Sequence, residues 1–205
     1  MAKNTHLEHL EDDIFNSGYN GATNSINFLI GLRDMLTTGK GGGNTKVTVK
    51  WDGAPAIVCG TDPQTGEFFV GNKSVFNKTT PKICYTDDFV DEHYPASGLN
   101  PILKMCLAEL SKLPIRGVIQ GDLLYEKRPS IVSMKGKKCY VFKPNTITYC
   151  VEVDSDLGRQ ISQSKIGIVF HTRYNGADIS SMAASFGVDV KPLQGVGSVA
   201  VFSSE

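Results

Sequence analysis

One segment brings together residue types that could do chemistry. Within residues 46–58 (KVTVKWDGAPAIV), Lys50 precedes an Asp-Gly pair that begins at Asp52. The alternation over residues 46–51 predicts a half-buried strand, on which Lys50 and Asp52 share the face opposite the apolar residues. An amine and a carboxylate that face a cleft suit nucleophilic or proton-transfer chemistry. The alternative is a surface lysine before an ordinary Asp-Gly turn.

Three later segments also place candidate residues at the ends of predicted strands. Lys73 lies in a Gly-Asn-Lys-Ser run directly after a strand-like stretch. Asp122 lies in an apolar strand predicted over residues 117–125, which puts a carboxylate at a sheet edge facing a cleft. Phe170 belongs to the apolar run 166–171, where it could pack in the core or line a pocket.

In their order along the chain, these segments resemble the motifs of the covalent nucleotidyltransferase superfamily of DNA ligases, RNA ligases and mRNA capping enzymes. Residues 50–53 (KWDG) match the Lys-x-Asp-Gly of the first motif, and residues 71–74 (GNKS) are similar to the second. Residues 118–125 (VIQGDLLY) are similar to the third motif, with Asp122 where glutamate is usual, and residues 166–171 (IGIVFH) to the next. Over nearly its whole length the chain is similar to ligase-like proteins of tailed bacteriophages.

The resemblance implies an α+β fold with a mainly antiparallel nucleotide-binding sheet, the ATP-grasp-like nucleotidyltransferase fold. It also implies a reaction. A lysine amine attacks the α-phosphate of ATP, with GTP less favoured, expels pyrophosphate and holds AMP as a phosphoramidate. The AMP then passes to a nucleic-acid 5′-phosphate end, so the enzyme is a polynucleotide ligase, with RNA slightly favoured over DNA by analogy.

Individual residues receive roles from the same resemblance. It implies that Lys50 and Asp52 are catalytic, although Asp52 could cap the turn instead of orienting the amine. Asp122 would accept a ribose hydroxyl or hold Mg²⁺ through a water molecule. The nucleotide-binding residues implied are Thr48, Val49, Gly53, Lys73, Asp122 and Phe170.

The implied reaction requires an activated lysine. A lysine with a pKa of about 10.4 is neutral in only about one of 2,500 molecules at pH 7, so the site must lower that pKa by desolvation and nearby cations. Magnesium on the phosphates, together with Lys46 or Lys73, could supply the positive field.

Two motifs of the superfamily are not found after Phe170: an acidic residue before glycine, and Lys-x-Lys. The nearest matches are Gln194-Gly195, which lacks the acid, and residues 135–137 (KGK), which come too early. The core is therefore either incomplete at its C-terminal end, which the final strand-like run 199–202 favours, or complete and degenerate. The degenerate case predicts a non-catalytic nucleotide or nucleic-acid binding module.

Composition limits the partners and the compartment that the protein can have. The 205 residues carry 21 Lys and Arg against 21 Asp and Glu, so there is no strongly basic footprint and any nucleic-acid contact must be local. No run approaches the roughly 18 apolar residues of a transmembrane helix, and the N-terminal residues are too polar for a signal peptide. The five cysteines form no CxxC pair. These features predict a cytoplasmic protein without a membrane partner.

The elements that must position the candidate residues fall into two parts. A capping box at Thr5 and apolar residues at helical spacing predict a helical hairpin over residues 1–45, with Gly18 ending its first helix. Residues 46–205 form the predicted core. Its strands are predicted at 56–60, 67–71, 117–125, 138–142, 147–152 and 166–171, and its helices at 99–113, 154–164 and 179–186.

A basic cluster leaves two interpretations open. Lys135, Lys137 and Lys138 are followed by Tyr140 and Phe142. The lysines could follow a nucleic-acid backbone while the aromatic rings stack on bases. They could equally be solvated residues of a β-hairpin.

Overall fold

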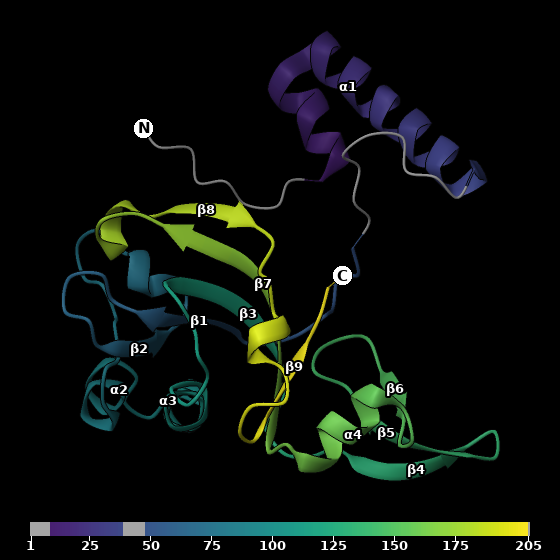
Figure 1. Ribbon diagram of the computed structural model, residues 1–205. Helices are drawn as coiled ribbons and strands as arrows, with labels where there is room; N and C mark the ends of the chain where they lie inside the picture. The colour runs from purple at the N-terminus through teal and green to yellow at the C-terminus, as the bar shows by residue number, and fades with distance from the viewer. Residues whose placement is uncertain (1–8, 39–47, 205) are drawn as a thin grey trace. The chain divides into compact units, whose positions relative to one another are not determined.

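The computed structural model describes residues 9–38 and 48–204 (Figure 1). The chain divides into two compact units between Val49 and Lys50. Within these described ranges, the smaller unit contains one helical element, and the larger contains two β-sheets with three further α-helices. In the described ranges, no helix combines the length and the apolar character that crossing a membrane requires.

The helical element α1 (Leu10–Thr38) consists of two segments that meet at Gly18, whose φ of 57° is not helical. The two segments lie against each other. A Cβ at Gly21 would come within 1.9 Å of the carbonyl oxygen of Asp13, and the Ser25 hydroxyl donates a 3.0 Å hydrogen bond to the first residue of α1. Gly18 thus ends the first segment, as the sequence predicts.

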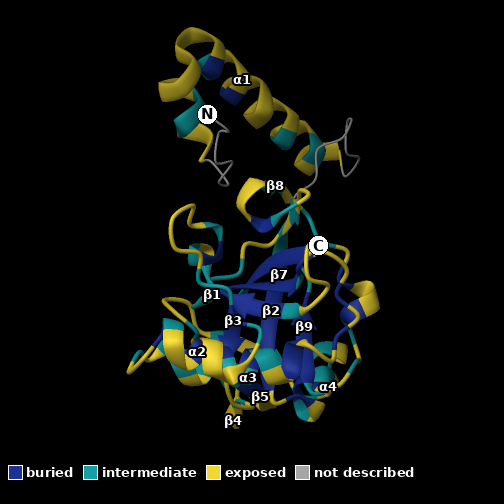
Figure 2. Ribbon diagram, turned by 90° about the vertical axis from the view of Figure 1, so that its left-hand side faces the viewer, coloured by how far each residue is buried: buried dark blue, intermediate teal, exposed yellow. Residues whose placement is uncertain are grey.

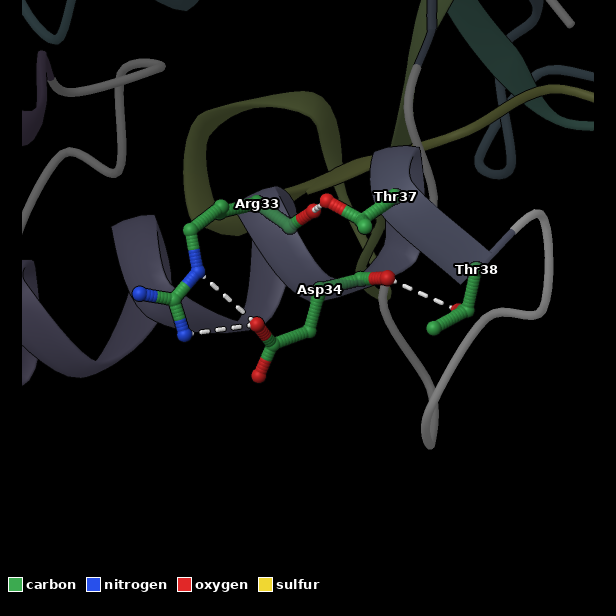
Figure 3. A network of polar contacts seen from close by, with 4 residues as sticks. All are labelled: Arg33, Asp34, Thr37 and Thr38. Carbon is green, nitrogen blue, oxygen red and sulfur yellow. Dashed lines mark hydrogen bonds and ion pairs between the residues drawn. The ribbon is translucent and has the colours of Figure 1, made fainter.

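In the last turn of α1, side-chain hydroxyls donate hydrogen bonds to backbone carbonyl oxygens (Figure 3). The hydroxyls of Thr37 and Thr38 donate to the carbonyl oxygens of Arg33 and Asp34, at 2.8 and 2.7 Å. Arg33 also donates twice to the Asp34 carboxylate, at 2.9 and 2.7 Å. Because both charged side chains are exposed, this pair adds at most about 1 kcal/mol to stability.

Apolar side chains of α1 remain largely exposed, with Phe15 at 85%, Tyr19 at 86% and Leu36 at 73%. The sequence predicts an amphipathic stripe here, and the two short segments do not bury it between them.

Sheet A, the larger sheet, has the strand order β2-β1-β3-β7-β8, and β9 pairs with β7. All pairings are antiparallel except that of β9 with the first half of β7. The strands are β1 (Ala56–Thr61), β2 (Phe68–Gly71), β3 (Val118–Tyr125), β7 (Ile166–Asn175), β8 (Ala183–Phe186) and β9 (Val199–Phe202).

One face of sheet A packs against helices α2 (Asp87–His93) and α3 (Leu99–Leu110). Helix α3 buries Leu103, Cys106 and Leu110, which lie on one face of the helix at spacings of three and four. Together with inward-facing strand residues they form the largest core cluster. Figure 2 shows the central strands of sheet A mostly in the dark colour of buried residues.

Sheet B is three-stranded, with β5 (Lys137–Phe142) between β4 (Ser130–Met134) and β6 (Tyr149–Glu152). Lys135 and Gly136, both with positive φ, form the two-residue turn of the β4–β5 hairpin. Helix α4 (Asp156–Gln163) follows β6 and contacts β9. Three short 3₁₀ turns complete the unit: η1 (Lys73–Phe76), η2 (Ile179–Ser181) and η3 (Lys191–Leu193).

The capping box predicted at Thr5 and the end of the predicted hairpin after residue 38 lie outside the described residues. Among the described residues, the predicted strands and helices are found with two exceptions. Of the strand predicted over 46–51, residues 46 and 47 are not described, and residues 48–51 are not a strand because they pair with no other strand. The helix predicted at 179–186 is wrong, since it is the turn η2 followed by β8. Strand β7 continues to Asn175 and so offers β8 a partner that the apolar run 166–171 does not reveal.

A buried carboxylate, Glu109 of α3, joins three elements. It accepts hydrogen bonds from Ser198 before β9, from Lys165 before β7 at 2.9 Å and from Lys112 at 2.9 Å. Burial alone would raise the pKa of Glu109, but these donors lower it to about 2.

This depressed pKa predicts an acid-sensitive contribution to stability. Since the carboxyl has its ordinary pKa of 4.5 when unfolded, its stabilisation is present above about pH 4.5 and is lost as the pH falls towards 2. We expect Glu109→Gln to lower the unfolding free energy by roughly 2 kcal/mol at pH 7, and by less at pH 3. Denaturation of both proteins at the two pH values measures the difference, with exposed Glu67→Gln as the control. A difference that is the same at both pH values contradicts the prediction.

Candidate functional site

Gly53 and Ala54 lie against strand β3. A Cβ at Gly53 would be 2.6 Å from the Cβ of Asp122 and 2.9 Å from the carbonyl oxygen of Leu123. The next residue, Ala54, donates its N–H to that same carbonyl at 2.9 Å. Only a residue without a side chain fits this approach, so glycine at position 53 brings the predicted first and third motif segments into contact.

Asp122 lies on the face of sheet A opposite helices α2 and α3. Along β3, Val118 packs in one apolar cluster of this face and Leu124 in another, and Asp122 lies between them in the alternation. Its carboxylate is partly open, with 24% of the side chain exposed. A partly exposed carboxylate therefore lies between two apolar clusters on this face of sheet A.

His171 is the neighbour of Asp122 that the sequence does not reveal. The ladder between β3 and β7 shifts at this point: Gly121 is opposite Phe170 and Gln120 is opposite Thr172, so His171 is an extra residue. Such a bulge redirects a side chain. His171 Nε2 lies 3.6 Å from Asp122 Oδ2, and its Nδ1 is 2.8 Å from the Thr172 hydroxyl.

The Asp52 carboxylate binds the loop that precedes β6. Its carboxylate accepts hydrogen bonds from the Asn145 side chain at 2.9 Å and from the backbone N–H groups of Thr146 and Ile147 at 2.7 and 3.0 Å. The bond from Asn145, then those from the two backbone groups, lower the pKa of Asp52, and the Lys50 charge lowers it further. The sequence left two roles open for Asp52, capping a turn or orienting the lysine amine. These hydrogen bonds correspond to capping, but of the loop before β6 and not of the turn that follows Asp52.

Trp51 and Tyr149 fix the same segment from the other side. The backbone N–H of Asp52 donates to the Tyr149 hydroxyl at 2.6 Å, and the rings of Trp51 and Tyr149 are 4.8 Å apart. The Trp51 indole N–H donates to the carbonyl of Ser203 at 2.9 Å. Side-chain contacts thus replace the predicted strand pairing, bury Trp51 in part and leave Lys50 exposed.

The residues before Lys50 belong to the smaller unit. Thr48 is half-buried and Val49 is 58% exposed, so the prediction that Val49 faces the core is wrong. Lys46, the other candidate cation, lies outside the described residues.

Lys73 lies farther from Asp122 than Gly53 does. Lys73 is the first residue of η1 and comes two residues after Gly71, the last residue of β2. In the sheet, Gly71 is opposite Val58 of β1. Asp122 of β3 is opposite Ala56 of β1. Because neighbouring strands are about 4.8 Å apart, the backbones of β2 and β3 are separated by about 10 Å. The exposed Lys73 thus lies at the same end of β1 as Asp122, two strands away.

The expectation that Phe170 lines an open pocket is not met in this structure. Val169 is the residue opposite Asp122, so Phe170 points to the other face of sheet A, where it is fully buried in the core with α3. A Cβ at Gly121 would lie 2.8 Å from its ring. The strand alternation thus assigns Phe170 to packing.

Tyr140 and Phe142 are also buried, at 5% and 7% exposure, and pack with α4 and β9. They are not free to stack on bases, which removes the aromatic part of the nucleic-acid interpretation of this hairpin. The adjacent Lys137 pairs with Glu152 at 2.6 Å.

No three His, Cys, Asp or Glu side chains gather as a metal site within residues 9–38 and 48–204. Asp122, against which Gly53 packs, offers a partly exposed carboxylate. Mg²⁺ is commonly held by one or two carboxylates together with substrate phosphates and water, so this residue meets the protein's part of that requirement.

The fold and the site define an α+β protein in which Gly53, three residues after the exposed Lys50, packs against Asp122 on a mainly antiparallel sheet. The chain belongs to a family of unknown function, DUF6267, whose sequence model matches residues 4–205. Neither a curated protein nor a solved structure matches it.

Proposed function

We propose that this protein is an ATP-dependent nucleotidyltransferase of the polynucleotide ligase type, with Lys50 as its nucleophile and the larger unit as a nucleotidyltransferase core. One observation carries the proposal: Gly53 packs on Asp122, so the Lys-x-Asp-Gly segment and the carboxylate of the predicted third motif are neighbours. These residues are about 70 positions apart in the sequence, and the resemblance requires them to meet.

The proposed reaction assigns each group a task. The Lys50 amine loses a proton to solvent and its nitrogen attacks the α-phosphate of ATP, so that a P–N bond forms while the bond to pyrophosphate breaks. AMP then passes from Lys50 to a nucleic-acid 5′-phosphate, with RNA as the favoured strand. Asp122 accepts a ribose hydroxyl or holds Mg²⁺ through water, and Lys73 contacts ribose and phosphate. Bound Mg²⁺ would neutralise phosphate charge.

Covalent labelling tests the proposal. The full chain, incubated with Mg²⁺ and ATP labelled at the α-phosphate, is expected to give an acid-labile labelled band. Lys50→Ala should abolish the band because no other side chain replaces the amine. Lys78→Ala, a change at an exposed lysine of the same unit, is the matched control and should label normally. Absence of label with both ATP and GTP would overturn the enzymatic proposal.

A non-catalytic nucleotide-binding module is the second candidate. The burial of Phe170 and the use of Asp52 as an anchor favour it, since two residues of the catalytic scheme then serve the fold. This candidate predicts saturable binding of ATP or AMP, weakened by Asp122→Ala, without a labelled band.

A further inference from the structure

Three sulfur atoms, one from each strand of sheet B, meet on one face of that sheet. Val141 of β5 is opposite Cys150 of β6, and Cys139 lies two residues before Val141, so the two cysteines share a face. On β4, Val132 is the direct partner of Cys139. Met134 comes two residues after Val132 and therefore lies on the same face. Sheet register alone thus brings Met134, Cys139 and Cys150 together.

Contacts between the side chains agree with the register. The Cys150 thiol lies 3.5 Å from the sulfur of Met134 and donates to it. The neighbouring Cys150 thiol is the largest cause of a raised pKa of Cys139, and burial adds to it. Cys139 is 3% exposed, whereas Cys150 is exposed and Met134 is 45% exposed. A nearly buried thiol thus adjoins two sulfur atoms that solvent can reach.

The arrangement does not suit a disulfide. Cys139 and Cys150 are diagonal neighbours, and such pairs have Cα atoms about 7–8 Å apart, beyond the roughly 4.4–6.8 Å that a disulfide spans. A metal ion placed between the sulfur atoms can bridge the greater separation. Zinc usually takes four nitrogen, sulfur or oxygen ligands, whereas two thiolates and a thioether form a soft, three-membered set of the kind that selects Cu(I).

We propose that Met134, Cys139 and Cys150 form a surface site for one Cu(I) ion. Two Cu–thiolate bonds and one Cu–thioether bond form, the two thiols release their protons to solvent, and no electron is transferred. The site is separate from the proposed nucleotidyl transfer, because its three ligands lie on sheet B and none of them has a role in that reaction.

Competition with a chelator tests the site. The full chain, reduced and kept without oxygen, is mixed with Cu(I) held by bicinchoninate, and loss of the coloured complex reports transfer to the protein. We expect one Cu(I) per chain, with three sulfur neighbours in X-ray absorption spectra. Cys150→Ser should weaken binding by more than about 100-fold, and Met134→Leu by about 10- to 100-fold, since even supporting residues of a metal site are worth 10–100-fold.

Two controls separate this site from unspecific thiol binding. Met182→Leu changes a methionine elsewhere and should leave the affinity unchanged. Cys59, Cys84 and Cys106 are buried in the core and stay in every variant, so they report background uptake. Unchanged Cu(I) affinity in Cys150→Ser would overturn the proposal, as would a Cys139–Cys150 disulfide detected by mass spectrometry of the purified chain without reductant.

Discussion

Phe170→Ala is expected to lower the unfolding free energy of the larger unit by about 3–5 kcal/mol, the usual effect of removing a buried aromatic ring. The ring is fully buried in the core cluster between sheet A and α3, so its removal costs both the lost burial and the cavity that it leaves. Denaturant titration measures the loss. Trp51, the one tryptophan of the chain, lies in a different cluster of the same unit and serves as the fluorescent reporter.

A milder variant and a surface control complete this test. Phe170→Leu keeps most of the volume and should cost less than half as much as Phe170→Ala. Phe186→Ala removes a phenylalanine that is 48% exposed, and a change below about 1 kcal/mol is expected. If Phe170→Ala left the unfolding free energy unchanged and weakened only nucleotide binding, the ring would belong to a pocket and its packing role would be refuted.

Gly53→Ala is expected to lower the rate of the proposed adenylylation of Lys50 by about 100-fold, the effect that a displacement of about 1 Å can have on a reacting group. The added methyl group would lie 2.6 Å from the Cβ of Asp122 and 2.9 Å from a backbone oxygen of β3. Neither neighbour can move alone, so residues 50–53 must shift away from the carboxylate. The accompanying loss of stability should be about 1–3 kcal/mol, as for other overpacked sites.

The matched control for this substitution is Gly98→Ala. A Cβ at Gly98 meets no atom within 4 Å, and the residue has an ordinary φ of −59°. Its labelling rate should equal that of the unchanged protein. Normal labelling by a folded Gly53→Ala protein would show that contact with Asp122 is not needed for the reaction, and would remove the main support for the proposed function.

Much of the fold could be predicted where the local pattern alone decides the structure. The run that became α3 shows apolar residues at helical spacing, and Gly18 interrupts α1 where its positive φ is needed. Apolar runs likewise predicted β3 and the first half of β7. Strand β4 was not predicted, because all five of its residues are exposed and no face of it shows a buried pattern.

The residues of the candidate site could be predicted from the sequence, but their neighbours could not. The type and order of Lys50, Asp52 and Asp122 are written in the sequence, but their neighbours depend on the tertiary register. The bulge that turns His171 towards Asp122 and the loop that binds Asp52 leave no local pattern. The alternation over 46–51 was misleading because Trp51 packs by side-chain contacts without any strand partner.

The anchoring of residues 51 and 52 has a consequence for the order of folding. Asp52 and Asn145 are 93 positions apart, and Trp51 and Ser203 are 152 apart. Contacts that close such long loops cost the most entropy and depend on structure already formed between their ends. We therefore expect the segment that carries Lys50 to reach its place only after sheets A and B have formed, so that a partly folded chain has its core strands in place before it has a candidate site.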